Sequence, residues 1–162
     1  MRRRGFTLVV GMCVTAILLV MGLALLGIKM AQYRGAMQAS QSAQAAAIAE
    51  AGLEDARAKL EKDPSFPPRL TDDTLTYSYA EDFTDVDGAF LGRYTVTIDM
   101  SKSRAPWRVV LLTSQGTLGS ESAPQARRRL HAELDVAPTL RVGGGPNPNY
   151  FKLLNWRDDS SL

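Results

Sequence analysis

The chain of 162 residues has one cysteine and one histidine. The single cysteine, Cys13, excludes an intramolecular disulfide and a cysteine-based metal site. The single histidine, His131, excludes paired histidine ligands, and no glycine-rich phosphate loop or nucleophile-elbow motif occurs. We therefore expect no enzyme, no catalytic residue, no metal site and no cofactor.

Charged residues make up an ordinary 22% of the chain but are unevenly distributed. The net charge is +2, and Arg2, Arg3 and Arg4 stand together at the N-terminus, so the rest of the chain has no basic excess. A second arginine triplet occupies residues 127–129, but on a strand its side chains alternate between two faces. Nucleic acid is therefore not expected as a partner.

Residues 6–28 carry no charged side chain. As a helix this run covers roughly 35 Å, enough to span a bilayer. A cleavable secretory signal has a shorter apolar core, of about 7 to 15 residues, and a twin-arginine signal a less hydrophobic one. The arginines before the run keep the N-terminus in the cytoplasm. The sequence therefore predicts a single-pass protein of the bacterial inner membrane with its C-terminal part outside.

The junction between the arginines and the apolar run reads RRRGFTLVV. This string resembles the cleavage signal of type IV prepilins and type II secretion pseudopilins. The resemblance implies that a prepilin peptidase cuts between Gly5 and Phe6 and that the new amino group of Phe6 is methylated. Residues 1–5 would then be a leader, with its charge supplied by the three arginines. Glycine suits this position because it lets an extended backbone approach a protease closely. An uncleaved signal anchor is the alternative.

One position departs from the family pattern. The fifth residue of the expected mature chain, usually glutamate in the family, is Val10. In major pilins that carboxylate is thought to pair with the terminal ammonium of a neighbouring subunit in apolar surroundings, where an unpaired charge is costly. Val10 therefore indicates a minor or initiating subunit, at the filament tip or placed sparsely along the shaft.

Three glycines interrupt the apolar run at Gly11, Gly22 and Gly27. Each weakens a helix by about 1 kcal/mol relative to alanine and leaves a flat patch for close helix contact. Two roles for these glycines remain open: partial unwinding of the helix within a filament, and close packing of small residues in a membrane.

Residues 29–62 continue the helical period with one apolar face and no helix breaker before Pro64. We expect one helix over residues 6–62, roughly 85 Å long. Its AEAGL string at residues 49–53 resembles the corresponding segment of minor pilins. The small side chains there predict a smooth face on which a sheet lies close, with Leu53 and Leu60 as the anchors.

Beyond a proline- and aspartate-rich loop the apolar period changes from 3.6 to 2. A sheet with one apolar face needs a cover, and the helix of residues 29–62 is the available one. The predicted fold class is α+β: a long N-terminal helix, membrane-spanning in its first half, packed on a roughly four-stranded antiparallel sheet in a pilin-like architecture. The expected strands lie near residues 75–79, 93–100, 107–113 and 126–136, with a turn at 114–116.

The C-terminal segment begins with glycines and prolines and ends in aromatic residues. We expect a flexible linker, then a tail that either docks on its own sheet or contacts another subunit. The predicted organisation is a leader at residues 1–5, an assembly helix at 6–28, its amphipathic half at 29–62, a sheet domain at 63–137, and linker and tail at 138–162.

Two polar features could suggest a ligand site. Asp82, Asp85 and Asp87 lie in EDFTDVDG, which is similar to a calcium loop but lacks its later bidentate glutamate. A polar hairpin turn is favoured over a cation site. His131 alternates out of the apolar face of its strand, and we expect it in solvent.

These observations favour a minor type IV pilin, a structural subunit at the tip or in initiation of a filament. Its expected partners are the prepilin peptidase, major and other minor pilins, the inner-membrane assembly platform, and membrane lipid before assembly. The expected location is the inner membrane and then the pilus on the cell surface. The alternatives are a type II secretion pseudopilin and a membrane-anchored periplasmic adaptor or binding module that does not polymerise. Adhesion, twitching, DNA uptake and secretion all remain open as its task.

Overall fold

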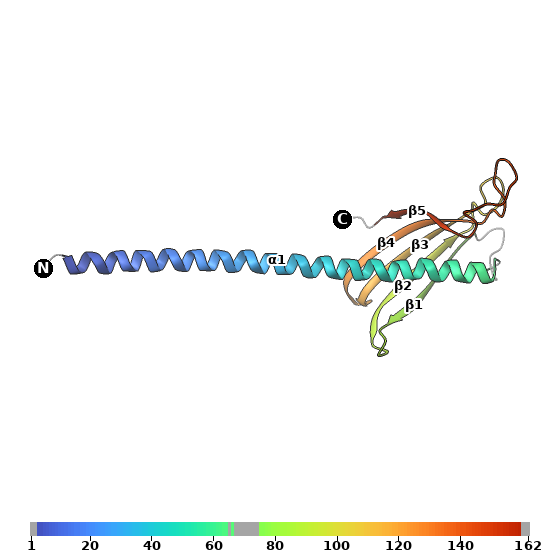
Figure 1. The fold of residues 1–162 in the computed structure, drawn as a ribbon. Coiled ribbons are helices and arrows are strands. Elements are labelled where there is room, and N and C mark those ends of the chain that lie inside the picture. Colours follow the sequence, from blue (N-terminus) through green and yellow to red (C-terminus); the bar gives the residue numbers. More distant parts are fainter. Residues whose placement is uncertain (1–2, 65, 67–74, 160–162) are drawn as a thin grey trace. The chain divides into compact units, whose positions relative to one another are not determined.

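A computed structural model describes residues 3–64, 66 and 75–159, except the side chains of residues 3–5 and 7. They form a helix followed by an antiparallel sheet (Figure 1). The chain divides into two compact units, residues 1–40 and 41–162. The elements are α1 (Arg3–Lys62), β1 (Thr76–Thr84), β2 (Phe90–Asp99), β3 (Val109–Ser120), β4 (Ala123–Asp135) and β5 (Leu153–Asp158).

The helix α1 begins three residues before the predicted start and ends at Lys62, as predicted. Pro64 follows directly, and the Asp63 amide still donates to the Lys59 carbonyl at 2.9 Å. Proline ends the helix because it has no amide hydrogen and its ring clashes with the preceding turn.

Residues 41–62 of α1 lie across one face of the sheet (Figure 1). The predicted anchors, Leu53 and Leu60, are 0% and 2% exposed. The small residues Ala45, Ala49, Gly52 and Ala56 on the same side of the helix are also buried, so the prediction of a smooth, sheet-facing surface is confirmed. The buried hydrophobic residues of the helix are Ala45, Ile48, Ala49, Leu53, Ala56 and Leu60.

The strands follow one another as an antiparallel meander in the order β1-β2-β3-β4-β5. Side chains alternate between the face under α1 and an outer face, as the period of two predicts. The inner face supplies the strand half of the core: Tyr94, Val96, Ile98, Val110, Leu112, Leu118, Leu130, Ala132 and Leu134.

The predicted strand count was one too low. The tail contributes β5, which pairs antiparallel with β4 from Leu130 opposite Asp158 to Leu134 opposite Leu153. The tail thus docks on its own sheet: Phe151, just before β5, packs on the core, whereas Trp156 of β5 is 48% exposed. The register of the β4–β5 pair shifts between His131 and Glu133.

The predicted turn at residues 114–116 was wrong. Strand β3 continues to Ser120, with Gly116 opposite Arg128 on β4, and the chain turns at residues 121–122. Ser114 and Gly116 face α1, where their small size permits close approach rather than reversing the chain. The strand also begins at Val109, which leaves Trp107 in the preceding loop, 61% exposed.

Candidate functional site

The expected cleavage site lies in the first turns of α1. Gly5 and Phe6 both have helical backbone, and the Phe6 side chain is 74% exposed. Arg2 lies outside the described residues, as do the side chains of Arg3, Arg4 and Gly5. A protease binds its substrate extended, so cleavage here requires the first turn to unwind. Gly5 weakens that turn by about 1 kcal/mol relative to alanine.

The apolar run offers no polar face. Every large hydrophobic side chain described from Phe6 to Ile28 is 43% to 74% exposed. The helix is long and apolar enough to cross a membrane, and its most apolar 18-residue window has mean hydropathy 2.7 with none of it buried. Each such side chain gains about 1.5–3 kcal/mol on leaving water. An apolar environment such as a membrane would accommodate this run.

Details of the run suit such an environment. The Thr15 hydroxyl donates to the carbonyls of Gly11 and Met12 at 3.1 and 2.9 Å, which satisfies it within the helix. A Cβ atom on Gly22 or Gly27 would meet nothing within 4 Å, and α1 remains helical through both. Val10 is 43% exposed and adds no charge.

A polar cluster joins the second half of α1 to β1. The Lys59 ammonium lies 2.6 Å from Asp55, pairs with Glu81 of β1, and sits 4.1 Å from the centre of the Tyr79 ring. The Tyr79 hydroxyl donates to Asp55 at 2.8 Å, and Tyr94 of β2 donates to Glu81 at 2.9 Å. Each carboxylate thus accepts from both the helix and the sheet.

Burial and these bonds fix the charge states in the cluster. Burial, together with the hydrogen bond to Asp55, raises the pKa of Tyr79 far above its usual value. Burial and the bond to Glu81 likewise raise the pKa of Tyr94. Burial of Lys59 would lower its pKa, but its hydrogen bonds to Asp55 and Glu81 outweigh this and raise it. The two phenols are neutral and the ammonium is charged, so charge-assisted hydrogen bonds join α1 to β1 and β2 in this cluster.

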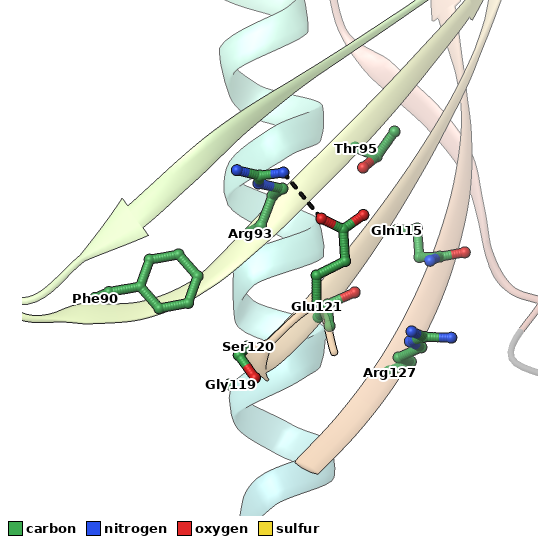
Figure 2. Close-up of a pocket in the computed structure, with 9 residues that line it drawn as sticks. Phe90, Arg93, Thr95, Gln115, Gly119, Ser120, Glu121 and Arg127 are labelled. Atoms are coloured by element: carbon green, nitrogen blue, oxygen red, sulfur yellow. Dashed lines mark hydrogen bonds and ion pairs between the residues drawn. The ribbon is translucent and has the colours of Figure 1, made fainter. Parts of the chain in front are cut away.

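The outer face of the sheet has a hollow of about 170 Å³ between β2 and β4 (Figure 2). Arg93 and Arg127 line it in one cross-strand row, each paired with Thr117 of β3. Arg93 donates to Asp82 at 2.7 Å and to Glu121 at 3.2 Å, and the bond to Asp82 raises its pKa. Figure 2 shows Glu121 reaching over the hollow towards Arg93. Arg93 is therefore already paired with two carboxylates of the chain itself and is not free to bind an external anion.

The arginine triplet divides between the faces of the sheet, as predicted. Arg127 and Arg129 are exposed on the outer face, where Arg129 donates to Gln115 at 3.0 Å. Arg128 points to the inner face and pairs with Asp158 of β5. The outer face also holds His131, predicted in solvent but half-buried, with Nδ1 3.2 Å from the Thr113 hydroxyl.

The aspartates of the β1–β2 turn serve the hairpin. Asp82 accepts from Arg93, and an Asp85 carboxylate oxygen accepts from the amide of Val86 at 2.7 Å. In the part of the chain that the structure describes, no three acidic, histidine or cysteine side chains are grouped to hold a metal ion.

The segment predicted as a flexible linker is tied to the sheet through Asp135. This carboxylate, 4% exposed, accepts from the Ala137 amide at 3.0 Å, Asn147 at 3.1 Å and Arg141 at 3.1 Å. Burial would raise the pKa of Asp135, but these hydrogen bonds outweigh burial and lower it. Arg141 also donates twice to the Trp107 carbonyl, at 3.0 and 2.8 Å. The glycine-rich composition suggested a flexible linker, but polar side chains at Asp135, Arg141 and Asn147 bond to one another across this segment.

Comparison with family models, curated proteins and solved structures gave no match. Function is therefore argued from the residues of this chain.

Proposed function

We propose that this protein is a minor type IV pilin, a structural subunit at the tip or in initiation of a type IV pilus or related filament. The observation that carries the proposal is a single helix with two different surfaces. Its first part is apolar and exposed all round, directly after an Arg-Arg-Arg-Gly-Phe junction, and its second part closes the core of an antiparallel sheet. A subunit that moves from bilayer to filament core needs the first surface, and an exported domain needs the second.

The chemistry of assembly is partition between apolar environments. Before assembly, residues 6–28 would lie in the inner membrane with the arginines on the cytoplasmic side. After cleavage between Gly5 and Phe6 and methylation of Phe6, the same helix would pack among its neighbours. Lipid tails are as apolar as leucine, so this exchange supplies little hydrophobic driving force. Extraction would therefore depend on helix packing and on an external assembly ATPase.

Val10 supports a minor rather than a major role. A charged group in an apolar helix bundle requires a partner, and Val10 offers none to a neighbouring ammonium. Such a subunit fits best where this pairing is not needed, as at the tip. A type II secretion pseudopilin would use the same surfaces and remains an alternative.

The second alternative is a membrane-anchored periplasmic adaptor that does not polymerise. The hollows on the sheet support the adaptor, because they offer a binding surface that does not depend on a filament. Cleavage after Gly5 distinguishes a pilin from an adaptor, because an adaptor does not need this cleavage to stay anchored in the membrane.

Mass spectrometry of the N-terminal peptide tests the proposal on protein from sheared surface filaments and from membranes of the native host. We expect a chain beginning at methylated Phe6 in the filament fraction. As a control, a Gly5→Val variant should keep residues 1–5 and remain in the membrane. A wild-type chain that retains residues 1–5 and never enters the filament fraction would leave the adaptor as the better account.

A further inference from the structure

Trp107 is an exposed side chain on a firmly held backbone. Its ring is 61% exposed, while its carbonyl accepts from Arg141 Nε at 3.0 Å and Nη2 at 2.8 Å. Arg141 is itself held by the buried Asp135. A large aromatic ring on a fixed support loses little conformational freedom on binding, which is why tryptophan is frequent at binding surfaces.

Trp107 is one of the residues that line a hollow of about 270 Å³. Val109 and Leu154 contribute its apolar lining, and Glu133 and Asn155 contribute polar groups. The Asn155 amide donates to Glu133 Oε2 at 2.6 Å. Within the described residues, the second carboxylate oxygen of Glu133 and the side-chain carbonyl of Asn155 receive no hydrogen bond. The lining of the hollow thus includes an aromatic residue and hydrogen-bond acceptors.

This combination selects a ligand with an apolar face and hydroxyl edges. A pyranose ring in which the hydroxyls are equatorial has axial C–H groups on its faces, which pack on an indole, and a rim of O–H donors. Each carboxylate has a cation nearby, Arg141 for Asp135 and Arg157 for Glu133, so the surroundings carry no net positive charge that would favour an anionic ligand. The volume lies below the roughly 300–1,000 Å³ of sites that enclose drug-sized ligands, so it suits one ring of a chain.

We propose that the hollow beside Trp107 binds a neutral, β-linked pyranose sugar, with the ring stacked on Trp107 and its hydroxyls donating to Glu133 and Asn155. The hollow beside Arg93 differs because Glu121 already reaches over it. The sugar site does not depend on polymerisation of the chain, so it stands or falls separately from the pilin proposal.

The test uses the full chain in a zwitterionic phosphocholine detergent, because maltoside and glucoside detergents would compete for a sugar site. Cellotetraose and chitotetraose are the probes. A Trp156→Phe variant leaves Trp107 as the only tryptophan, since the chain contains two. We expect a saturable blue shift of Trp107 emission with a Kd on the order of 1 mM for at least one probe.

Calorimetry on the wild-type chain and single variants then assigns the site. Trp107→Ala and Trp107→Leu should each weaken binding at least tenfold, and Glu133→Ala should weaken it several-fold. Phe90→Ala is the matched control, an aromatic side chain of 48% exposure at the other hollow, and should leave Kd unchanged. The open-chain polyol sorbitol should give no shift.

Three results would overturn the proposal: no saturable signal with either tetrasaccharide up to about 20 mM, undiminished binding in both Trp107 variants, or an equal response to sorbitol. Equal unfolding midpoints of wild type and variants would ensure that lost binding reflects the site.

Discussion

Gly116 of β3 lies against the main chain of α1 at Ala49: a Cβ atom on Gly116 would be 2.5 Å from the Ala49 nitrogen. The same Cβ would lie 2.2 Å from the Ala45 carbonyl oxygen. No side chain fits between the two backbones, so this glycine sets how closely the helix approaches the sheet.

Gly116→Ala should therefore destabilise the sheet unit by about 1–3 kcal/mol, because the added methyl group meets rigid backbone rather than a flexible side chain. Urea unfolding of the full chain in detergent, followed by tryptophan fluorescence, measures the loss. Gly145→Ala is the control, since its Cβ would meet only Leu140 at 3.9 Å. Equal unfolding free energies for the two variants would contradict this account of the contact.

Tyr79→Phe should cost about 1.5–3 kcal/mol, because it removes a hydroxyl that donates to the ionised Asp55. Tyr77→Phe is the control, since its hydroxyl bonds to no described residue. The folded state raises the pKa of Tyr79, so its contribution is complete below pH about 10 and is lost as pH rises above that value. Stability measured from pH 8 to 11 should fall less steeply in Tyr79→Phe than in the wild type.

Asp135→Asn should destabilise the chain by about 2–4 kcal/mol, because Arg141 loses its charged partner and the buried amide duplicates the donor of Asn147. The folded state lowers the pKa of Asp135, so its contribution is present above pH about 4 and is lost as pH falls through the folded value. Unfolding free energies from pH 2 to 7 should show this acid-side loss in the wild type and not in the variant. Asp87→Asn, in the exposed turn, should keep it.

Val10→Glu should raise the number of copies per filament, because the restored carboxylate offers a partner to a neighbouring terminal ammonium. Quantitative mass spectrometry of purified filaments provides the count. Val14→Glu places the same charge one turn further along the apolar helix, without a partner, and should lower incorporation. An unchanged count and position for Val10→Glu would remove the inference drawn from Val10.

Much of the helix and part of the sheet follow from local signals. The apolar period and Pro64 predict where α1 ends, and the small residues around Ala49 predict its sheet-facing side. The alternating residues of β2 and β4 predict which side chains are buried. Ser114 and Gly116 misled the prediction, because the same residues that favour a turn also permit a helix to pass close above a strand.

The candidate sites follow the same division. The cleavage junction is a contiguous string, so sequence alone can suggest it. The Asp135 cluster joins β4, the loop after it and the loop before β3. The hollow beside Trp107 joins these segments to β5. No local pattern marks them.

The sequence by itself determined a charge-free run, a long helix with one small-residue face, and a set of alternating strands. These properties depend on neighbouring residues, on helical and strand periods, and on the stereochemistry of proline and glycine. Tertiary structure decided the length of β3, the fifth strand, the anchoring of the C-terminal loop by Asp135, and the hollow beside Trp107. The length of β3 depends on the close packing of α1 over Gly116. Strand pairing brings the fifth strand and the lining of the hollow together from distant parts of the chain. The Asp135 contacts depend on the fold of the loop after β4.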